Sequence, residues 1–265
     1  MTSSSSPIIY YRDMTAKLYS QRRFLKRIIL VCPLVLIILF VILKLGFSST
    51  YRNIIEEDSW LENMQAIAYL VASVFSFLVM AGFAQRRRTL HALLFFIFAM
   101  ALIFICLEEI SWGQRILNLP TPEYFKAHNK QSELSFHNLD IVRQSSLIKL
   151  YILVGLVGSF GWLMIPKRIK RDERIAIAYL IPDWYLMFYF LPVTAIYSYF
   201  DVVSLVASHW HTPDYLSIGH IVIWRDQEPA ELLLSFGFLL FVIRNKLRQS
   251  LNGVGRGRPG ISFDR

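Results

Sequence analysis

The residues of this sequence with the clearest chemical potential stand where a long apolar run ends. Residues 92–107 contain no charged side chain, and Glu108 and Glu109 follow directly. A charged side chain inside a membrane helix costs roughly 2.5–3.5 kcal/mol on insertion scales, so two adjacent carboxylates need a structural or chemical reason. A partly buried glutamate can serve as a general base or as a metal ligand. We therefore regard Glu108 and Glu109 as candidate catalytic residues.

The residues after this pair would extend a polar helix face. If the helix continues, the residues three, four and seven positions beyond Glu108 share its face. These residues are Ser111, Trp112 and Arg115. In the functional interpretation, Trp112, Gln114 and Arg115 bind the head group of a substrate. In the structural interpretation, Glu108 and Arg115 form an ion pair near the membrane surface, and Trp112 belongs to the aromatic belt there.

A second group of polar residues follows in the segment 113–146. Glu133 and His137 are four residues apart, and Asn138 comes next. The imidazole of histidine gains and loses a proton near neutral pH, which suits it to proton transfer and to metal binding. We expect His137 to be catalytic, and Glu133 and Asn138 to contact the substrate. The alternative is a hydrogen-bonded loop histidine, with Asn138 capping the lead-in to the next helix.

Three further histidines fall in the segment 201–228. His209 and His211 are separated by one residue, so an extended backbone would place both imidazoles on one side. His220 would then complete a ligand set of the kind that binds zinc. The spacing matches no recognised zinc signature. A zinc site formed by His209, His211 and His220 and a loop at the membrane surface both fit this pattern.

Composition and hydropathy indicate an all-α membrane protein. Of the 265 residues, 55% are hydrophobic and 18% are charged, whereas soluble domains carry about 25% charged residues. Several apolar runs approach the roughly 20 residues that a helix needs to cross a bilayer. We predict a polytopic transmembrane helix bundle of about six spans, or seven if residues 215–224 insert, with a fifth span kinked by Pro182 and Pro192. The six spans are approximately 28–47, 64–84, 91–112, 147–166, 175–200 and 229–243.

The basic residues predict an orientation for this bundle. Twenty of the 28 lysines and arginines lie in the N-terminal segment, in two tight turns and in the C-terminal tail. The loops 48–63, 113–146 and 201–228 together carry six. The positive-inside rule therefore predicts cytoplasmic termini and three external loops. Because the basic clusters flank apolar runs, the net charge of +9 does not indicate a nucleic-acid partner.

The same pattern divides the chain into three parts. Residues 1–27 form a basic cytoplasmic segment, residues 28–244 form the membrane domain, and residues 245–265 form a basic tail expected to be disordered. The three external loops would bring acidic and histidine side chains to one membrane face, where acid/base chemistry could be assembled. The start of the last span adds Glu228 and Glu231 to this face.

The string from Glu108 to Arg115, EEISWGQR, resembles the central motif of a family of bacterial multi-pass membrane proteins without an assigned activity. The resemblance implies where the site lies and that the protein is a multi-pass protein of a bacterial inner membrane, and it names no reaction. Two enzyme groups offer chemical analogies only. Glutamic intramembrane proteases place an arginine where Gly113 stands here, and the His-x-x-x-His signature of ceramidase-like zinc hydrolases is absent. The downstream residues that share the family pattern are Asn129, Gln131, Glu133, His137 and Asn138.

Two main classes of function follow from these residues. The first is an integral-membrane hydrolase or transferase acting on a lipid or lipid-linked substrate at the outer leaflet. In it, Glu108 or Glu109 activates water or binds a metal ion, and His137 moves protons. The second is a non-enzymatic assembly factor that docks a membrane-protein partner through residues 113–146. A small transporter with Asp183 lining its path is a third hypothesis, although no inverted repeat is visible.

Overall fold

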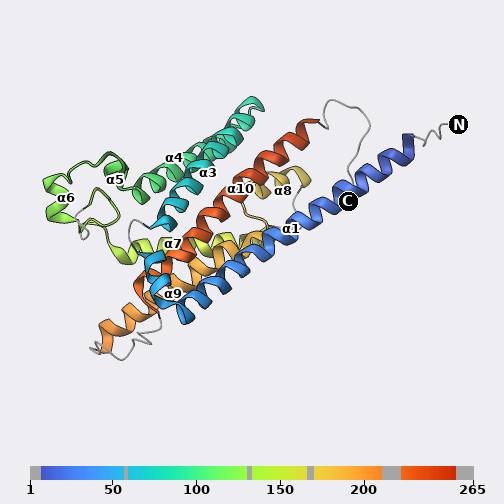
Figure 1. The fold of residues 1–265 in the computed structure, drawn as a ribbon. Helices are drawn as coiled ribbons and strands as arrows, with labels where there is room; N and C mark the ends of the chain where they lie inside the picture. Colours follow the sequence, from blue (N-terminus) through green and yellow to red (C-terminus); the bar gives the residue numbers. More distant parts are fainter. Residues whose placement is uncertain (1–6, 57–58, 130–132, 166–169, 211–221, 255–265) are drawn as a thin grey trace.

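The computed structural model describes residues 7–56, 59–129, 133–165, 170–210 and 222–254 of the chain (Figure 1). Within these residues the regular elements are helices, which confirms the all-α prediction, and one isolated β-bridge joins Asn129 to Leu139. The α-helices are α1 (Pro7–Gly46), α2 (Ser48–Ile55), α3 (Trp60–Gln85), α4 (Thr89–Glu109), α5 (Gln114–Leu117), α6 (Glu123–His128), α7 (Gln144–Phe160), α8 (Arg171–Ala178), α9 (Met187–Trp210) and α10 (Glu228–Val254). Short 3-10 turns are η1 (Ser111–Gly113), η2 (Gly161–Met164), η3 (Trp184–Leu186) and η4 (Trp224–Gln227).

Five helical segments of the described chain are long and apolar enough to cross a membrane, which fits a multi-pass membrane protein. This is one fewer than predicted. The sixth predicted span falls in α10, whose 27 residues extend about 40 Å. Charged residues lie towards both ends of α10, so it is less apolar than the other five. The five segments are Phe24–Gly46, Trp60–Gln85, Thr89–Glu109, Gln144–Met164 and Trp184–Val203.

The fifth span begins later than predicted. The α8 helix ends at Ala178, and the chain returns to helical structure only at Trp184. Proline lacks a backbone N–H and clashes with the preceding helical turn, so Pro182 separates two helices instead of kinking one. Pro192, by contrast, lies inside α9 as predicted.

The last helix ends later than predicted, because residues 245–254 are helical and do not belong to a disordered tail. Asn245 Nδ2 donates to the carbonyl oxygen of Tyr179 at 2.8 Å, and Gln249 Nε2 donates to that of Val79 at 2.9 Å. Both side chains are buried. These contacts hold the extension of α10 against α3 and against the residue that follows α8.

Glycine permits close packing between helices of the bundle. A Cβ atom added to Gly155 or Gly158 of α7 would lie 2.2 Å from side-chain atoms of Thr194 or Phe190, both in α9. A Cβ on Gly237 of α10 would lie 3.0 Å from the Phe190 ring. Small residues at such contacts let helix backbones approach closely within a membrane. The Phe190 ring therefore joins α7, α9 and α10.

The alternating helix directions give the bundle two chemically different ends (Figure 1). At the first, which we call the site end, α1 and α4 finish and α3, α7 and α10 begin. Lys44 of α1 pairs there with Asp226, which precedes α10. At the opposite end, which we call the arginine end, Arg86 hydrogen-bonds a carbonyl near the end of α10, and Arg244 pairs with Asp183.

Candidate functional site

The chain leaves α4 through a sharp turn immediately after Glu109. Ser111, Trp112 and Gly113 have φ angles of 47°, 54° and 79°. Residues other than glycine rarely adopt positive φ, and bulky residues do so least often. The span that was predicted to end near residue 112 therefore ends at Glu109, and the polar face expected if the helix continued to Arg115 does not form.

Two side-chain hydrogen bonds hold this left-handed turn. Trp112 Nε1 donates to Glu108 Oε1 at 2.5 Å, and Ser111 Oγ donates to Glu133 Oε2 at 2.7 Å. Backbone in sparsely populated regions costs about 1–3 kcal/mol per residue and persists where surrounding contacts enforce it, often at functional sites. The turn thus brings the end of α4 against the loop that contains Glu133.

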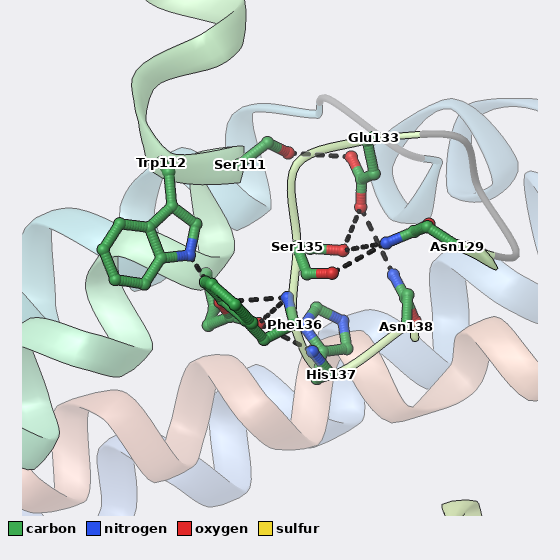
Figure 2. Close-up of polar contacts among 9 residues, drawn as sticks. Ser111, Trp112, Asn129, Glu133, Ser135, Phe136, His137 and Asn138 are labelled. Atoms are coloured by element: carbon green, nitrogen blue, oxygen red, sulfur yellow. Dashed lines mark hydrogen bonds and ion pairs between the residues drawn. The ribbon is translucent and has the colours of Figure 1, made fainter. Parts of the chain in front are cut away.

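Glu108 anchors this loop. Its carboxylate accepts the backbone N–H groups of Phe136 and His137, both at 2.9 Å, and lies 2.8 Å from His137 Nδ1 (Figure 2). The Glu108 side chain is 7% exposed, whereas that of His137 is 48% exposed. Together with Trp112, these contacts give the carboxylate four donors, which matches the acceptor capacity of an ionised carboxyl group. Glu108 is therefore occupied by protein groups.

His137 presents its second ring nitrogen away from Glu108. Because a carboxylate only accepts hydrogen bonds, Nδ1 of His137 carries the proton in this contact, and Nε2 of the neutral ring remains an acceptor. A carboxylate holding Nδ1–H is the arrangement that fixes the tautomer of catalytic histidines and of many metal-binding ones. The pair can act through Nε2 as a general base or as a metal ligand.

Glu133 organises the rest of the loop (Figure 2). Besides Ser111 Oγ, its carboxylate accepts Ser135 Oγ at 3.1 Å and Asn138 Nδ2 at 3.3 Å. Asn129 Nδ2 donates to the carbonyl oxygen of Ser135 at 2.7 Å. Glu133 and Asn138, which were predicted to contact substrate, hold the backbone on either side of His137.

Gln114 ties α5 to the same loop. Its Oε1 accepts the backbone N–H of Leu134 at 2.7 Å, and its Nε2 donates to Thr121 Oγ1 at 2.5 Å. The alternative role for Asn138, as the cap of the next helix, is wrong because Arg143 holds the N-cap position of α7. The predicted substrate-binding residue Gln114 thus has loop contacts in this structure.

Glu109 belongs to a different group of side chains from its neighbour Glu108. It interacts electrostatically with Glu62 of α3 and with Glu228 and Glu231 of α10. We call these four residues, Glu62, Glu109, Glu228 and Glu231, the carboxylate cluster. Arg225 Nη1 lies 3.4 Å from a carboxylate oxygen of Glu62 and 3.4 Å from one of Glu228. Adjacent residues of a helix point in different directions, which explains why the two glutamates separate.

Neutral polar side chains complete this cluster. Gln65 Nε2 donates to Glu228 Oε2 at 3.2 Å, and Tyr197 Oη donates to Glu231. His137 lies close enough to Glu228 to interact with it electrostatically. The imidazole of the loop and the carboxylates at the start of α10 therefore belong to one polar region.

The sequence interpretation missed Gln65, Tyr197 and Arg225. A signal was available for the first two, because polar groups inside apolar spans are costly unless a partner satisfies them. Arg225 had no such signal, since it stands in a polar segment before α10. Its proximity to two glutamates depends on how α3 and α10 pack.

Four predicted site residues are described only in part or not at all. His211 and His220 fall outside the described residues, so the predicted zinc ligand set is not observed as a whole. His209 lies in the last turn of α9 and Arg115 lies in α5, and only their backbone is described. Among the described residues, no group of three or more His, Cys, Asp or Glu side chains is arranged to hold a metal ion.

Comparisons with known proteins assign no function to this site. The chain matches no protein-family model, no curated protein and no solved structure. The resemblance of the motif between Glu108 and Arg115 to a bacterial membrane family remains a prediction.

Proposed function

We propose that this protein is a membrane-embedded acid/base enzyme, a hydrolase or a transferase, with His137 as its general base. The observation that carries this proposal is the contact between Glu108 and His137. A buried carboxylate lies 2.8 Å from Nδ1 of an imidazole whose side chain is half-exposed. One nitrogen is held by the protein while the other can reach a substrate, which is the arrangement that a positioned base requires.

In the proposed mechanism, Nε2 of His137 removes a proton from water or from a substrate hydroxyl as that oxygen attacks an electrophilic centre. The resulting imidazolium is stabilised by the carboxylate of Glu108 at Nδ1. The imidazolium then returns the proton to the leaving group. Acid/base catalysis of this kind contributes about 10²–10⁴-fold to a rate. Glu109 interacts electrostatically with Glu228, which itself interacts with His137.

A lipid or lipid-linked molecule is the substrate class that best fits this location. The polar region lies at the site end, where the apolar segments of α3, α4 and α7 begin or end. Phe104, Trp112 and Phe136 form an aromatic group next to Glu108, with ring centroids 5.3 to 6.4 Å apart. Aromatic side chains favour the boundary between acyl chains and head groups.

The charge distribution supports an external position for this surface. Basic residues are concentrated in the turns and tail of the arginine end, whereas the loops of the site end carry few. The positive-inside rule places the arginine end in the cytoplasm and the site end at the outer surface of a bacterial inner membrane.

A matched pair of histidine variants tests the proposal. Cells that lack the protein are complemented with wild type, His137→Ala or His128→Ala, and their lipid profiles are compared. His128 lies in α6 against Tyr124, with ring centroids 4.8 Å apart, and serves as the control. We expect His137→Ala to reproduce the profile of the deletion strain and His128→Ala to restore that of wild type. A wild-type profile from a folded His137→Ala protein would contradict the proposal.

A zinc ion at His137 would need further protein ligands, because catalytic zinc sites use about three, and no such set is arranged among the described residues. Nε2 of His137 would be the ligand atom, and Glu108 would be the outer-shell carboxylate that orients it. A bound zinc ion would activate water for hydrolysis. Metal analysis of the detergent-purified protein tests this version, since zinc present in wild type and lost in His137→Ala would identify the ligand.

A second candidate function is the docking of a membrane-protein partner through residues 113–146. Ile116, Leu117 and Ile141 of this segment are 71%, 66% and 83% exposed. Large apolar side chains exposed in this way are typical of interaction surfaces. Docking predicts a stoichiometric partner that co-purifies with wild type and is lost when Ile116 and Leu117 are both replaced by serine. The enzyme proposal predicts that this double variant keeps the wild-type lipid profile.

A further inference from the structure

A cavity of about 780 Å³ lies between α1, α2, α9 and α10, on a part of the bundle that the proposed catalytic residues do not line. Residues between 34 and 45 of α1 form one wall, and residues between 188 and 199 of α9 form another. Pro229, Ala230 and Leu233 of α10 also line the cavity. Cavities of roughly 300–1,000 Å³ are the usual size of small-molecule sites.

The length of the cavity corresponds to one leaflet of a membrane. Its walls run from Leu34 to Leu45 and from Phe188 to Tyr199, which is about 17 Å along each helix at 1.5 Å per residue. Half of a hydrocarbon core about 30 Å thick is about 15 Å. The two helices run side by side in this region (Figure 1). An acyl chain that enters from one leaflet could therefore lie between them over its full depth.

The cavity opens to the outside of the bundle along α1. Leu34, Val41 and Leu45 line it, and all three side chains are exposed. On the opposite wall, Pro192 and Ala195 have small side chains that leave room between the helices. The opening faces the side of the bundle, where lipid would surround a membrane protein, so a hydrocarbon chain could enter without crossing a polar layer.

Polar side chains meet at the site end of this cavity. Lys44 Nζ pairs with Asp226, Tyr51 Oη donates to Asp226 Oδ1 at 2.8 Å, and the backbone N–H of Ile223 donates to Asp226 Oδ2 at 2.7 Å. Burial, followed by the contact with Asp226, raises the pKa of Tyr51, so its phenol stays neutral. The Lys44 side chain is 24% exposed and that of Asp226 is 7% exposed. An ammonium group has three donors, so Lys44 can bind a ligand while it keeps its contact with Asp226.

We propose that this cavity binds a zwitterionic phospholipid of the leaflet at the site end, with one acyl chain between α1 and α9. The phosphate accepts hydrogen bonds from Lys44, and the ammonium of the head group lies near Asp226. A pair of opposite charges complements a head group that carries both charges. A lipid with a net negative charge would instead place its excess charge next to Asp226. Burial of the acyl chain against apolar walls supplies most of the affinity.

Native mass spectrometry of the full chain in detergent tests this proposal. The protein is incubated with equal amounts of phosphatidylethanolamine and phosphatidylglycerol, and the retained lipid is identified. Ala195→Trp fills the cavity from an exposed position in α9, and Ala101→Trp places the same side chain at an exposed position of α4 as the control. We expect wild type and Ala101→Trp to retain phosphatidylethanolamine, and Ala195→Trp to retain about tenfold less.

Variants at Lys44 test the head-group contact separately. Lys44→Met should lower the retention of phosphatidylethanolamine, because the phosphate loses its donor, and Lys44→Arg should keep it. Equal retention by Ala195→Trp and Ala101→Trp, a preference of wild type for phosphatidylglycerol, or a protein subunit bound in place of lipid would each overturn the proposal. None of these measurements depends on His137, so the lipid site and the catalytic proposal can fail independently.

Discussion

The two ends of the bundle differ in how their charged side chains are paired. At the arginine end, Asp183 binds both Arg244 and Arg248, and the same arginines donate to the carbonyl oxygen of Ala178 at 3.0 and 2.9 Å. These charges meet an opposite charge or a carbonyl at the end of a helix. The arginine end is therefore a network that fastens α10 to the segment between α8 and α9.

At the site end, acidic groups outnumber the basic group in contact with them. The carboxylate cluster brings four glutamates together, and Arg225 is the cation that contacts it among the described residues. Beside the cluster stands His137, half-exposed and held at one nitrogen. Clusters of acidic side chains in a partly buried site are costly and occur often where a protein performs chemistry. This difference agrees with the proposal that the site end performs the chemistry, and it indicates that the arginine end stabilises the bundle.

Replacing His137 should have the largest effect on function and little effect on stability. We expect His137→Ala to lower turnover about 10²–10⁴-fold, the usual contribution of a general base. Because half of this side chain is exposed, the unfolding temperature should stay close to that of wild type. Turnover and thermal unfolding of the purified protein check both statements. A large loss of thermal stability would mean that His137 stabilises the fold, as the residues of the arginine end do.

Replacing Arg244 should show the reverse pattern. Breaking a buried ion pair costs about 3–5 kcal/mol, and because Asp183 and Arg244 are partly exposed we expect about 2–3 kcal/mol for Arg244→Met. Arg248→Met is the matched control and should cost less, since Arg248 is more exposed and lies 3.4 Å from Asp183. Denaturant unfolding in detergent measures both variants. Turnover per folded molecule should not change in either one.

Replacing Glu108 should affect both properties, because this residue joins α4 to the loop and holds the imidazole of His137. In Glu108→Gln, a single side-chain oxygen has to accept the hydrogen bonds that two carboxylate oxygens accept in wild type. Donors left without an acceptor should lower the free energy of unfolding by about 1–3 kcal/mol. The amide also loses control of the His137 tautomer, so turnover should fall as well. If unfolding is unchanged, then Glu108 does not anchor the loop as described.

The smallest expected effect concerns Tyr51 and depends on pH. Its pKa is raised by burial and by Asp226, so the folded state holds the phenolic proton more tightly than the unfolded state does. The stabilisation is then complete below the usual tyrosine pKa of about 10 and is lost as the pH rises above it. We expect Tyr51→Phe to cost about 1 kcal/mol at pH 7. The difference between wild type and Tyr51→Phe in unfolding free energy should shrink above pH 10.

Hydropathy and charge predicted the general architecture because both act locally along the chain. The apolar runs identified the five segments of the described chain that are long and apolar enough to cross a membrane, within a few residues at most ends. The alternation of helix directions then required Glu108 and His137 to lie at the same end. One error occurred where a single residue ended a helix within an apolar run, since Pro182 divides the predicted fifth span. Another occurred where buried polar side chains extend α10 to Val254.

The sequence by itself determined that the chain is an all-α bundle, which residues could do chemistry, and at which end of the bundle they gather. Tertiary structure alone decided which partners each of these residues contacts. Glu108 meets backbone donors 28 and 29 residues away, and Lys44 meets Asp226 across 182 residues. The left-handed turn at Ser111 and Trp112 exists because such distant contacts offset its cost. Periodicity and composition report a residue's neighbours along the chain, whereas hydrogen bonds and ion pairs depend on which distant segments the packed helices bring together.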